Sequence, residues 1–220
     1  MNTIYTYSLA LLVCVNLYSC QTLEQKRARA QEIINIHNMT PAQLEETFAQ
    51  FSDENQNTCS WFEQHASKLS DSLLTVVPDA EVKMMGSRRW DTTHLLSDID
   101  AVVVTQVSDH EKVVDALQDW YVAQYPEVKQ FRTKTRAGLS LFILKAFTDP
   151  KLGEMKLEYT VQSPETNRAI INGMTARLAT RFTSPTEKNH YAVAMMKAVY
   201  DDNIQEQLAL KEWTRVLPGN

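Results

Sequence analysis

The sequence is poor in the residues that build several common kinds of site. It has three cysteines in 220 residues, and Cys14 and Cys20 both lie in the N-terminal segment, which leaves Cys59 alone. This placement gives no disulfide framework and no zinc-ligand spacing. The five histidines are scattered as well. No Walker A, Gly-x-Ser-x-Gly or Rossmann glycine pattern occurs, which excludes the enzyme classes that carry those motifs.

Positive charge is also in short supply. The chain has 22 Lys and Arg against 27 Asp and Glu, a net charge of −5. Proteins that hold long nucleic acids by bulk electrostatics carry a basic face, so this class is not favoured. A local basic strip remains open, because Arg132, Lys134 and Arg136 alternate along a predicted strand. They would either steer phosphates or protect an exposed edge strand from mispairing.

The N-terminal segment, residues 1–20, contains no charged side chain. Its apolar run at 9–15 has the length of a signal-peptide core and is too short to span a bilayer. Residues 17–20 resemble a bacterial lipoprotein cleavage box, with Cys20 as the lipidated first mature residue. We therefore expect export or membrane anchoring through Cys20. The lack of Lys and Arg before the apolar run favours the alternative, a cytoplasmic protein.

Hydrophobic periodicity predicts the elements of the fold. Helices are predicted at 23–37, 40–51, 58–77, 110–125 and 167–182, with a linker at 52–57 and a last helix opening at the capping box Ser184–Glu187. Strands are predicted at 81–85, 98–104, 128–136, 139–147 and 154–161. This order is typical of an α+β fold, a small mixed or antiparallel sheet with flanking helices. We expect N-terminal helices at 21–57, a core at 58–165 and a C-terminal helical region at 166–220.

The most informative stretch is residues 85–104, where two aspartates open a β-branched run. Side chains alternate along a strand, so Asp98 and Asp100 project from the same side. Two neighbouring carboxylates repel unless a cation lies between them, and such oxygen ligands suit Mg²⁺ or Mn²⁺. The pair therefore predicts a metal site for phosphoryl transfer. A solvated strand start is the alternative for an isolated Asp-x-Asp.

A turn upstream of the aspartates favours the metal site. Gly86 permits a close backbone approach, and Ser87 is able to open a helix whose free N–H groups face an anion. Arg88 adds positive charge beside them. We expect Gly86, Ser87 and Arg88 to hold a triphosphate whose α-phosphate meets metals at Asp98 and Asp100.

Gly86-Ser87, nine intervening residues, then Ser97-Asp98-Ile99-Asp100 and an apolar strand resemble the signature of the polymerase-β-like nucleotidyltransferase superfamily. The spacing is most similar to its template-independent members, the poly(A) and terminal uridylyl polymerases and the oligoadenylate synthases. The resemblance implies transfer of a nucleotidyl group from an NTP such as ATP to a hydroxyl. It also implies a third carboxylate on a neighbouring strand and a helical lysine at the triphosphate. Many relatives have a second glycine where this chain has Asp91.

Two residues fit the further positions that the resemblance implies. In residues 154–161, apolar and polar side chains alternate, and Glu158 lies on the polar side, which makes it the candidate third metal ligand. Relatives more often have aspartate there, and an exposed strand glutamate is the alternative. Lys197 borders the apolar face of the last helix and is the candidate triphosphate contact. A lysine that extends from a packed helix toward solvent is the alternative.

The sequence thus predicts a metal-dependent nucleotidyltransferase with Asp98, Asp100 and Glu158 as its catalytic and metal-binding residues. Asp100 or Glu158 would also accept the proton of the acceptor hydroxyl. The spacing favours an RNA 3′ end as acceptor, while the acidic charge and small size also allow a small molecule or a protein. The alternative is an exported binding or regulatory module on the same fold with a decayed site, because Asp91 and Glu158 depart from the family pattern.

Overall fold

The computed structural model describes residues 24, 25, 28, 41–126, 131–136, 139–149 and 153–214. The signal-like segment at 1–20 lies outside these residues, as does most of the predicted helix at 23–37, so both stay predictions. The side chains of Arg132, Lys134 and Arg136 are also outside the described set. Among the described helices, none combines the length and the apolar character needed to cross a bilayer.

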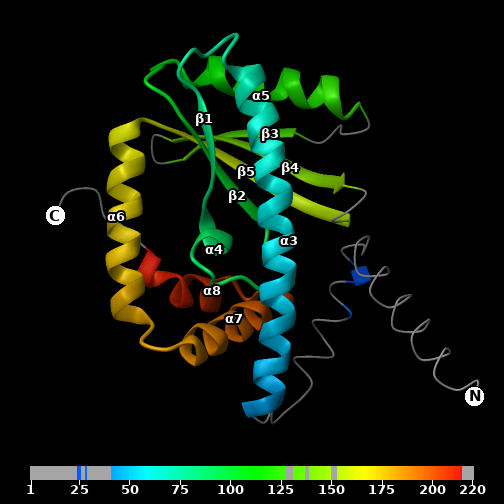
Figure 1. Cartoon of the computed structure of the whole chain (residues 1–220), viewed down its shortest axis with the longest axis vertical. Coiled ribbons are helices and arrows are strands. Elements are labelled where there is room, and N and C mark those ends of the chain that lie inside the picture. The colour runs from blue at the N-terminus through cyan, green and yellow to red at the C-terminus, as the bar shows by residue number, and fades with distance from the viewer. Residues whose placement is uncertain are drawn as a thin grey trace, which may run out of the picture.

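A five-stranded mixed sheet, in the order β1-β2-β5-β4-β3, forms the centre of the fold (Figure 1). Its strands are β1 (Glu81–Met84), β2 (Ile99–Val104), β3 (Phe131–Arg136), β4 (Leu139–Asp149) and β5 (Gly153–Gln162). β2 and β5 pair in parallel, and the other neighbours pair antiparallel. The predicted α+β class with a small mixed sheet is confirmed, and all five predicted strands are present.

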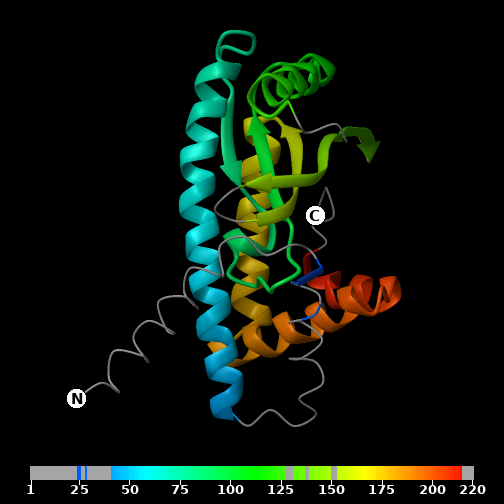
Figure 2. The same ribbon diagram turned by 90° about the vertical axis from the view of Figure 1, so that its right-hand side faces the viewer.

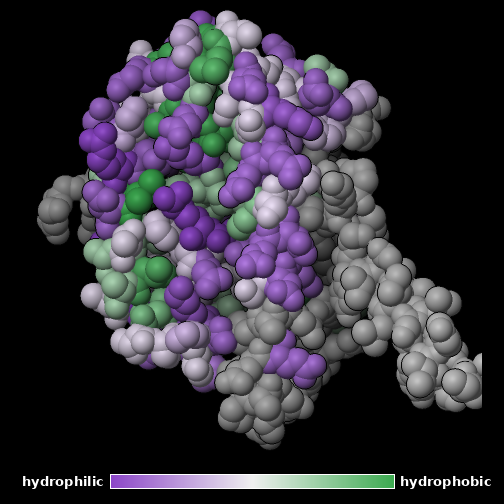
Figure 3. All heavy atoms as spheres, in the orientation of Figure 1, coloured by the Kyte–Doolittle hydropathy of each residue, from purple (hydrophilic) through white to green (hydrophobic). Residues whose placement is uncertain are grey.

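Two helices, α3 (Pro41–Leu73) and α5 (His110–Gln124), pack on one face of the sheet. Figure 2 shows α3 running along the length of the molecule beside β1. Phe62, Leu69 and Leu73 of α3 are buried against Leu117 and Tyr121 of α5 and apolar side chains of four strands. The outward side of α3 is largely hydrophilic (Figure 3), as expected of an amphipathic helix that covers a core.

The predicted linker at 52–57 is wrong, because α3 passes through it without a break. Polar residues that suggested a loop have partners within the helix or beside it. The Thr58 hydroxyl donates to the Glu54 carbonyl at 2.8 Å, and the Asn55 amide donates to the Arg88 carbonyl at 3.3 Å. Both side chains are buried. Satisfied in this way, they no longer compete with the helical backbone.

The other face of the sheet is covered by α6 (Pro164–Arg181), whose Ile170 and Ile171 pack on Val102 and Val104. Helices α7 (Pro185–Tyr200) and α8 (Ile204–Leu210) and the 3₁₀ helix η2 (Glu212–Thr214) follow, with α7 and α8 lying below the end of the sheet (Figure 1). The predicted start of α7 is confirmed, since the Ser184 side chain accepts from the Glu187 amide and Pro185 opens the helix.

A buried hydrogen-bonded chain joins α3, α5 and β5. His65 Nε2 lies 2.6 Å from the Tyr121 hydroxyl, which lies 2.5 Å from the Tyr159 hydroxyl. Tyr121→Phe should lower the free energy of unfolding by about 1–3 kcal/mol, because buried polar atoms lose a partner. Urea denaturation measures this. Tyr125→Phe is the control, since its hydroxyl is 3.5 Å from His65 Nδ1 and only half-buried. If the two variants lost equal free energy of unfolding, the Tyr121 hydroxyl would not be the group whose hydrogen bonds stabilise this chain of side chains.

Candidate active site

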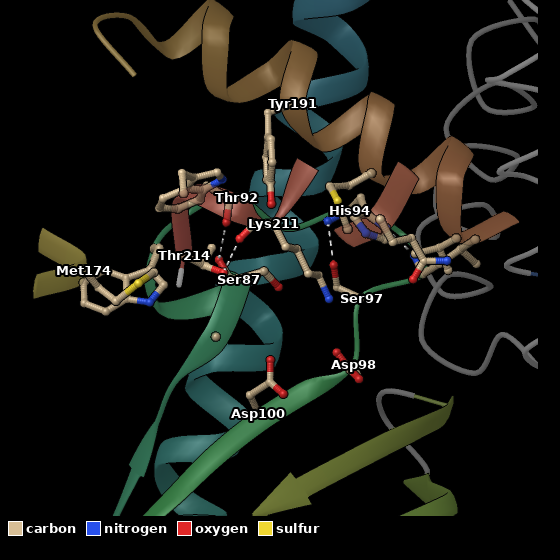
Figure 4. Close-up of a pocket in the computed structure, with 17 residues that line it drawn as sticks. Ser87, Thr92, His94, Ser97, Asp98, Asp100, Met174, Tyr191, Lys211 and Thr214 are labelled. Atoms are coloured by element: carbon tan, nitrogen blue, oxygen red, sulfur yellow. Dashed lines mark hydrogen bonds between the residues drawn. The ribbon is translucent and has the colours of Figure 1, made fainter. Parts of the chain in front are cut away.

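A cavity of about 360 Å³ lies where the end of the sheet meets the C-terminal helices (Figure 4). One wall is the segment from Gly86 to Ser97; Asp98, just before β2, and Asp100, within β2, follow it. The opposite wall comes from α6, α7, α8 and η2, and includes Met174, Tyr191, Met195, Gln207, Lys211 and Trp213. The cavity thus has an acidic end at the sheet and a mixed apolar and basic wall facing it.

Three carboxylates meet at the acidic end. Asp98, Asp100 and Glu158 each offer an oxygen, and these oxygens lie within 4.8 Å of one another. The parallel pairing of β2 and β5 sets Asp100 directly opposite Glu158, and Asp98 reaches the same side from just before β2. The structure therefore brings the three predicted ligands together. Oxygen donors at this spacing fit Mg²⁺ or Mn²⁺.

Gly86 allows the turn before α4 (Gly86–Arg89) to come against Asp100. Its φ is +66°, and a Cβ added to it would lie 1.9 Å from Asp100 Oδ2. The neighbouring Met85 amide donates to the Asp100 carbonyl at 2.8 Å. The turn is thereby fixed beside the carboxylate, with Ser87 on the cavity wall.

Asp91 keeps the left-handed conformation that a glycine would supply. Its φ is +55°, and the Ser87 carbonyl accepts from the Thr92 amide at 2.9 Å to close the turn around it. Aspartate is among the residues that adopt this region most readily. Lys188 Nζ lies 3.9 Å from the Asp91 carboxylate, which is largely exposed. Asp91 therefore closes the turn without a glycine at this position.

The structure places Arg88, a predicted triphosphate contact, outside the residues that line the cavity. Its guanidinium donates to the carbonyls of Ser97 at 2.9 Å and Asp98 at 3.1 Å, and to Asn55 Oδ1 at 3.4 Å. Successive helical residues point about 100° apart, so Ser87 and Arg88 of α4 face different sides. Burial lowers the pKa of Arg88, and Asp98 and Asp100 oppose that shift. Arg88 thus positions the backbone that carries Asp98.

The structure also places Lys197 away from the cavity. Lys197 Nζ pairs with Asp201 at 2.9 Å on the exposed side of α7. Lys211, between α8 and η2, lines the cavity instead, and Figure 4 shows its amino group directed toward Asp98 and Asp100. Lys211 could not be predicted from the sequence, because it belongs to no helical pattern and reaches the cavity only through the folding of the C-terminal helices.

His94 is a second cavity residue that the sequence did not indicate. It is 7% exposed, and burial lowers its pKa to about 3, so the ring is neutral at pH 7. The Leu96 amide donates to His94 Nδ1 at 3.2 Å, which assigns the ring hydrogen to Nε2. His94 therefore supplies a neutral N–H donor at the cavity wall.

Lys156 shares the acidic end with the carboxylates. Its Nζ lies 3.0 Å from Asp98 Oδ2 and 2.9 Å from Glu158 Oε2. Burial lowers the pKa of Lys156, but Asp98 and Glu158 outweigh burial and raise it above its usual value. Burial, Asp98 and Glu158 together raise the pKa of Asp100 to about 7. Among the described residues, the Asp100 carboxylate has no hydrogen-bond or ion-pair partner.

Asp100 should make the stability of the metal-free protein depend on pH. Its pKa is about 7 in the native state and about 3.9 when unfolded, so between these values the native state binds more protons and stability falls as pH rises. Asp100→Asn should therefore be more stable than wild type at pH 8 by at least about 1.4 kcal/mol, equivalent to one pKa unit. The difference should shrink toward pH 4.

Urea denaturation with EDTA across this pH range measures the effect. Asp119→Asn, an exposed change on α5, is the control and should show no such trend. A stability difference for Asp100→Asn that stays constant with pH would contradict the raised pKa.

Comparison with known proteins gives distant structural similarities. No protein-family model matches the chain, and no curated protein matches it. It is similar to Cid1 poly(U) polymerase bound to MgGTP (16% identity, TM-score 0.41, 66% of this chain and 39% of that one). It is also similar to a cytoplasmic RNA terminal U-transferase (12% identity, TM-score 0.39, 79% of this chain and 43% of that one). A third similar structure is the GLD-2/RNP-8 complex (10% identity, TM-score 0.46, 87% of this chain and 66% of that one). The chain spans two fifths to two thirds of the length of these structures. At TM-scores below 0.5, the likeness does not by itself assign a family.

Proposed function

We propose that this chain is a metal-dependent nucleotidyltransferase, which moves a nucleoside monophosphate from an NTP to a hydroxyl acceptor. The observation that carries the proposal is the convergence of Asp98, Asp100 and Glu158: the two aspartates line the cavity together with Gly86 and Ser87, and Glu158 offers an oxygen within 4.8 Å of theirs. Carboxylates on neighbouring strands beside a tight glycine turn provide both parts of a site for a metal-bound triphosphate.

The three carboxylates would hold Mg²⁺ or Mn²⁺. When bound, such an ion neutralises the charge that develops on the reacting phosphate. The carboxylates also provide a base. Asp100, or Glu158 opposite it on β5, would accept the proton of the acceptor hydroxyl.

The remainder of the cavity suits the nucleotide. Ser87 offers a hydroxyl beside the carboxylates, and Lys211 brings a positive charge that already lowers the pKa of Asp100 from across the cavity. A triphosphate between them would meet a cation on the side away from the carboxylates. Further from the sheet, the aromatic and apolar side chains of Tyr191, Trp213 and Met195 form a wall suited to a base or ribose.

An RNA 3′ end is the acceptor that we propose first, because the Gly86–Asp100 spacing resembles template-independent RNA polymerases. A small molecule or a protein hydroxyl would also be compatible with the net charge of −5. The decayed-module alternative has no support in the geometry, because the carboxylates converge and Gly86 leaves room for Asp100.

Replacement of either aspartate tests the proposed activity. Purified protein is incubated with each labelled NTP, Mg²⁺ or Mn²⁺ and a mixed RNA pool, and label on RNA or on the protein itself is measured. Asp98→Asn and Asp100→Asn should each reduce transfer by about 10³-fold or more, because each removes a ligand that stabilises transition-state charge. Circular dichroism should show an unchanged fold. Asp119→Asn should transfer normally, and undiminished transfer in both site variants would contradict the proposal.

A pair of lysine variants tests which lysine meets the triphosphate. Lys211→Ala should raise KM for the NTP about tenfold or more, because a hydrogen bond to a charged group contributes about 1.5–3 kcal/mol. Lys197→Ala should leave KM unchanged, because its amino group pairs with Asp201 outside the cavity. Steady-state kinetics at fixed Mn²⁺ measures both. A larger effect of Lys197→Ala would restore the sequence-based assignment.

A further inference from the structure

Lys156 places a covalently attached cation among the metal ligands. It precedes Glu158 by two residues on β5, so both side chains project from the same face of the sheet. From there its ammonium reaches Glu158 Oε2 at 2.9 Å on its own strand and Asp98 Oδ2 at 3.0 Å on the neighbouring segment. Asp100, the third carboxylate, forms no hydrogen bond or ion pair with Lys156 and is influenced by its charge only at longer range. The ammonium therefore bridges one specific pair of ligands.

This bridge occupies space that a divalent ion would need. An ion bound to the same two oxygens would lie about 2.0–2.1 Å from each, between the carboxylates. The ammonium nitrogen already lies between them, at 2.9 and 3.0 Å from those oxygens. Two cations at that point would also repel each other strongly. An ion between Asp98 and Glu158 and the Lys156 bridge therefore exclude each other.

Charge balance points the same way. When all three carboxylates are ionised, as metal binding requires, they carry three negative charges. Lys156 balances one of them, and one divalent ion neutralises the other two. The Asp98–Asp100 pair remains open to that ion, because Asp98 keeps its second oxygen and Asp100 has no partner among the described residues. Two-metal sites, by contrast, hold ions about 3.5–4 Å apart.

We propose that the Lys156 ammonium takes the place of one of the two divalent ions of a two-metal site. This inference rests on the proposed function. The site then holds a single Mg²⁺ or Mn²⁺ between Asp98 and Asp100, and Lys156 fixes Glu158 and balances its charge. Lys156 is thus a positioning residue of the metal site, and it limits the metal stoichiometry to one.

Counting Mn²⁺ tests this inference without an activity assay. Electron paramagnetic resonance and calorimetry with Mn²⁺ alone give the number of ions bound per chain and show whether neighbouring ions are exchange-coupled. Wild type should bind one uncoupled ion at the site. Lys156→Met, of similar length and no charge, should bind two coupled ions, and Lys156→Arg should bind one. Lys188→Met is the matched control, because Lys188 pairs with Asp91 outside the carboxylate group, and it should bind one.

The outcomes separate this inference from the proposed function. Two coupled ions in wild type would overturn the role of Lys156 and leave the nucleotidyltransferase proposal standing. A single ion in a folded Lys156→Met would also overturn it. No Mn²⁺ bound by wild type or by any variant would overturn the proposed function itself. The wild-type count is decisive even if Lys156→Met does not fold.

Discussion

The repulsion among three carboxylates held within 4.8 Å is the constraint on which the site depends. A fold that places them so close must fix their backbones firmly, because each side chain would otherwise turn away into water. The parallel ladder between β2 and β5 supplies that fixation, with Asp100 opposite Glu158. The next residues along these strands, Ala101 and Tyr159, are buried in the core under α3 and α5. Hydrophobic burial on one face thus holds together charges that repel on the other.

Two residues beside the strands complete this fixation in different ways. Gly86 acts by having no side chain, since a Cβ there would occupy the position of the Asp100 carboxylate. Arg88 acts by donating to the carbonyls of Ser97 and Asp98, while Asn55 of α3 accepts from the same guanidinium. Asn55 lies within the stretch 52–57, which was predicted to be a linker but is part of α3. The unbroken helix therefore helps to position Asp98, because it holds Asn55 against Arg88.

The features that depend on local periodicity, such as the face of a strand from which a side chain projects, could be predicted from the sequence. Alternation along each strand placed Asp98 and Asp100 on one face of their strand and Glu158 on the polar face of its own. Pairing of β2 with β5 then brings the three side chains together. The sequence did not reveal that Arg88 faces the helix and not the cavity, because a four-residue helix has no periodicity to read. Lys211 and His94 were missed for a related reason. They reach the cavity through contacts between segments far apart in the chain, and the residues around them carry no matching spacing.

The two lysines near the carboxylates have different tasks. Lys156 contacts Asp98 and Glu158 directly, so its charge is balanced within the protein before any ligand binds. Lys211 lies across the cavity and influences Asp100 only at longer range. Its charge is therefore available to an incoming anion. A neutral His94 beside it adds a donor without further charge. The two ends of the cavity therefore attract opposite charges. The carboxylates at the sheet attract a cation, and the C-terminal wall attracts the phosphates that accompany such a cation.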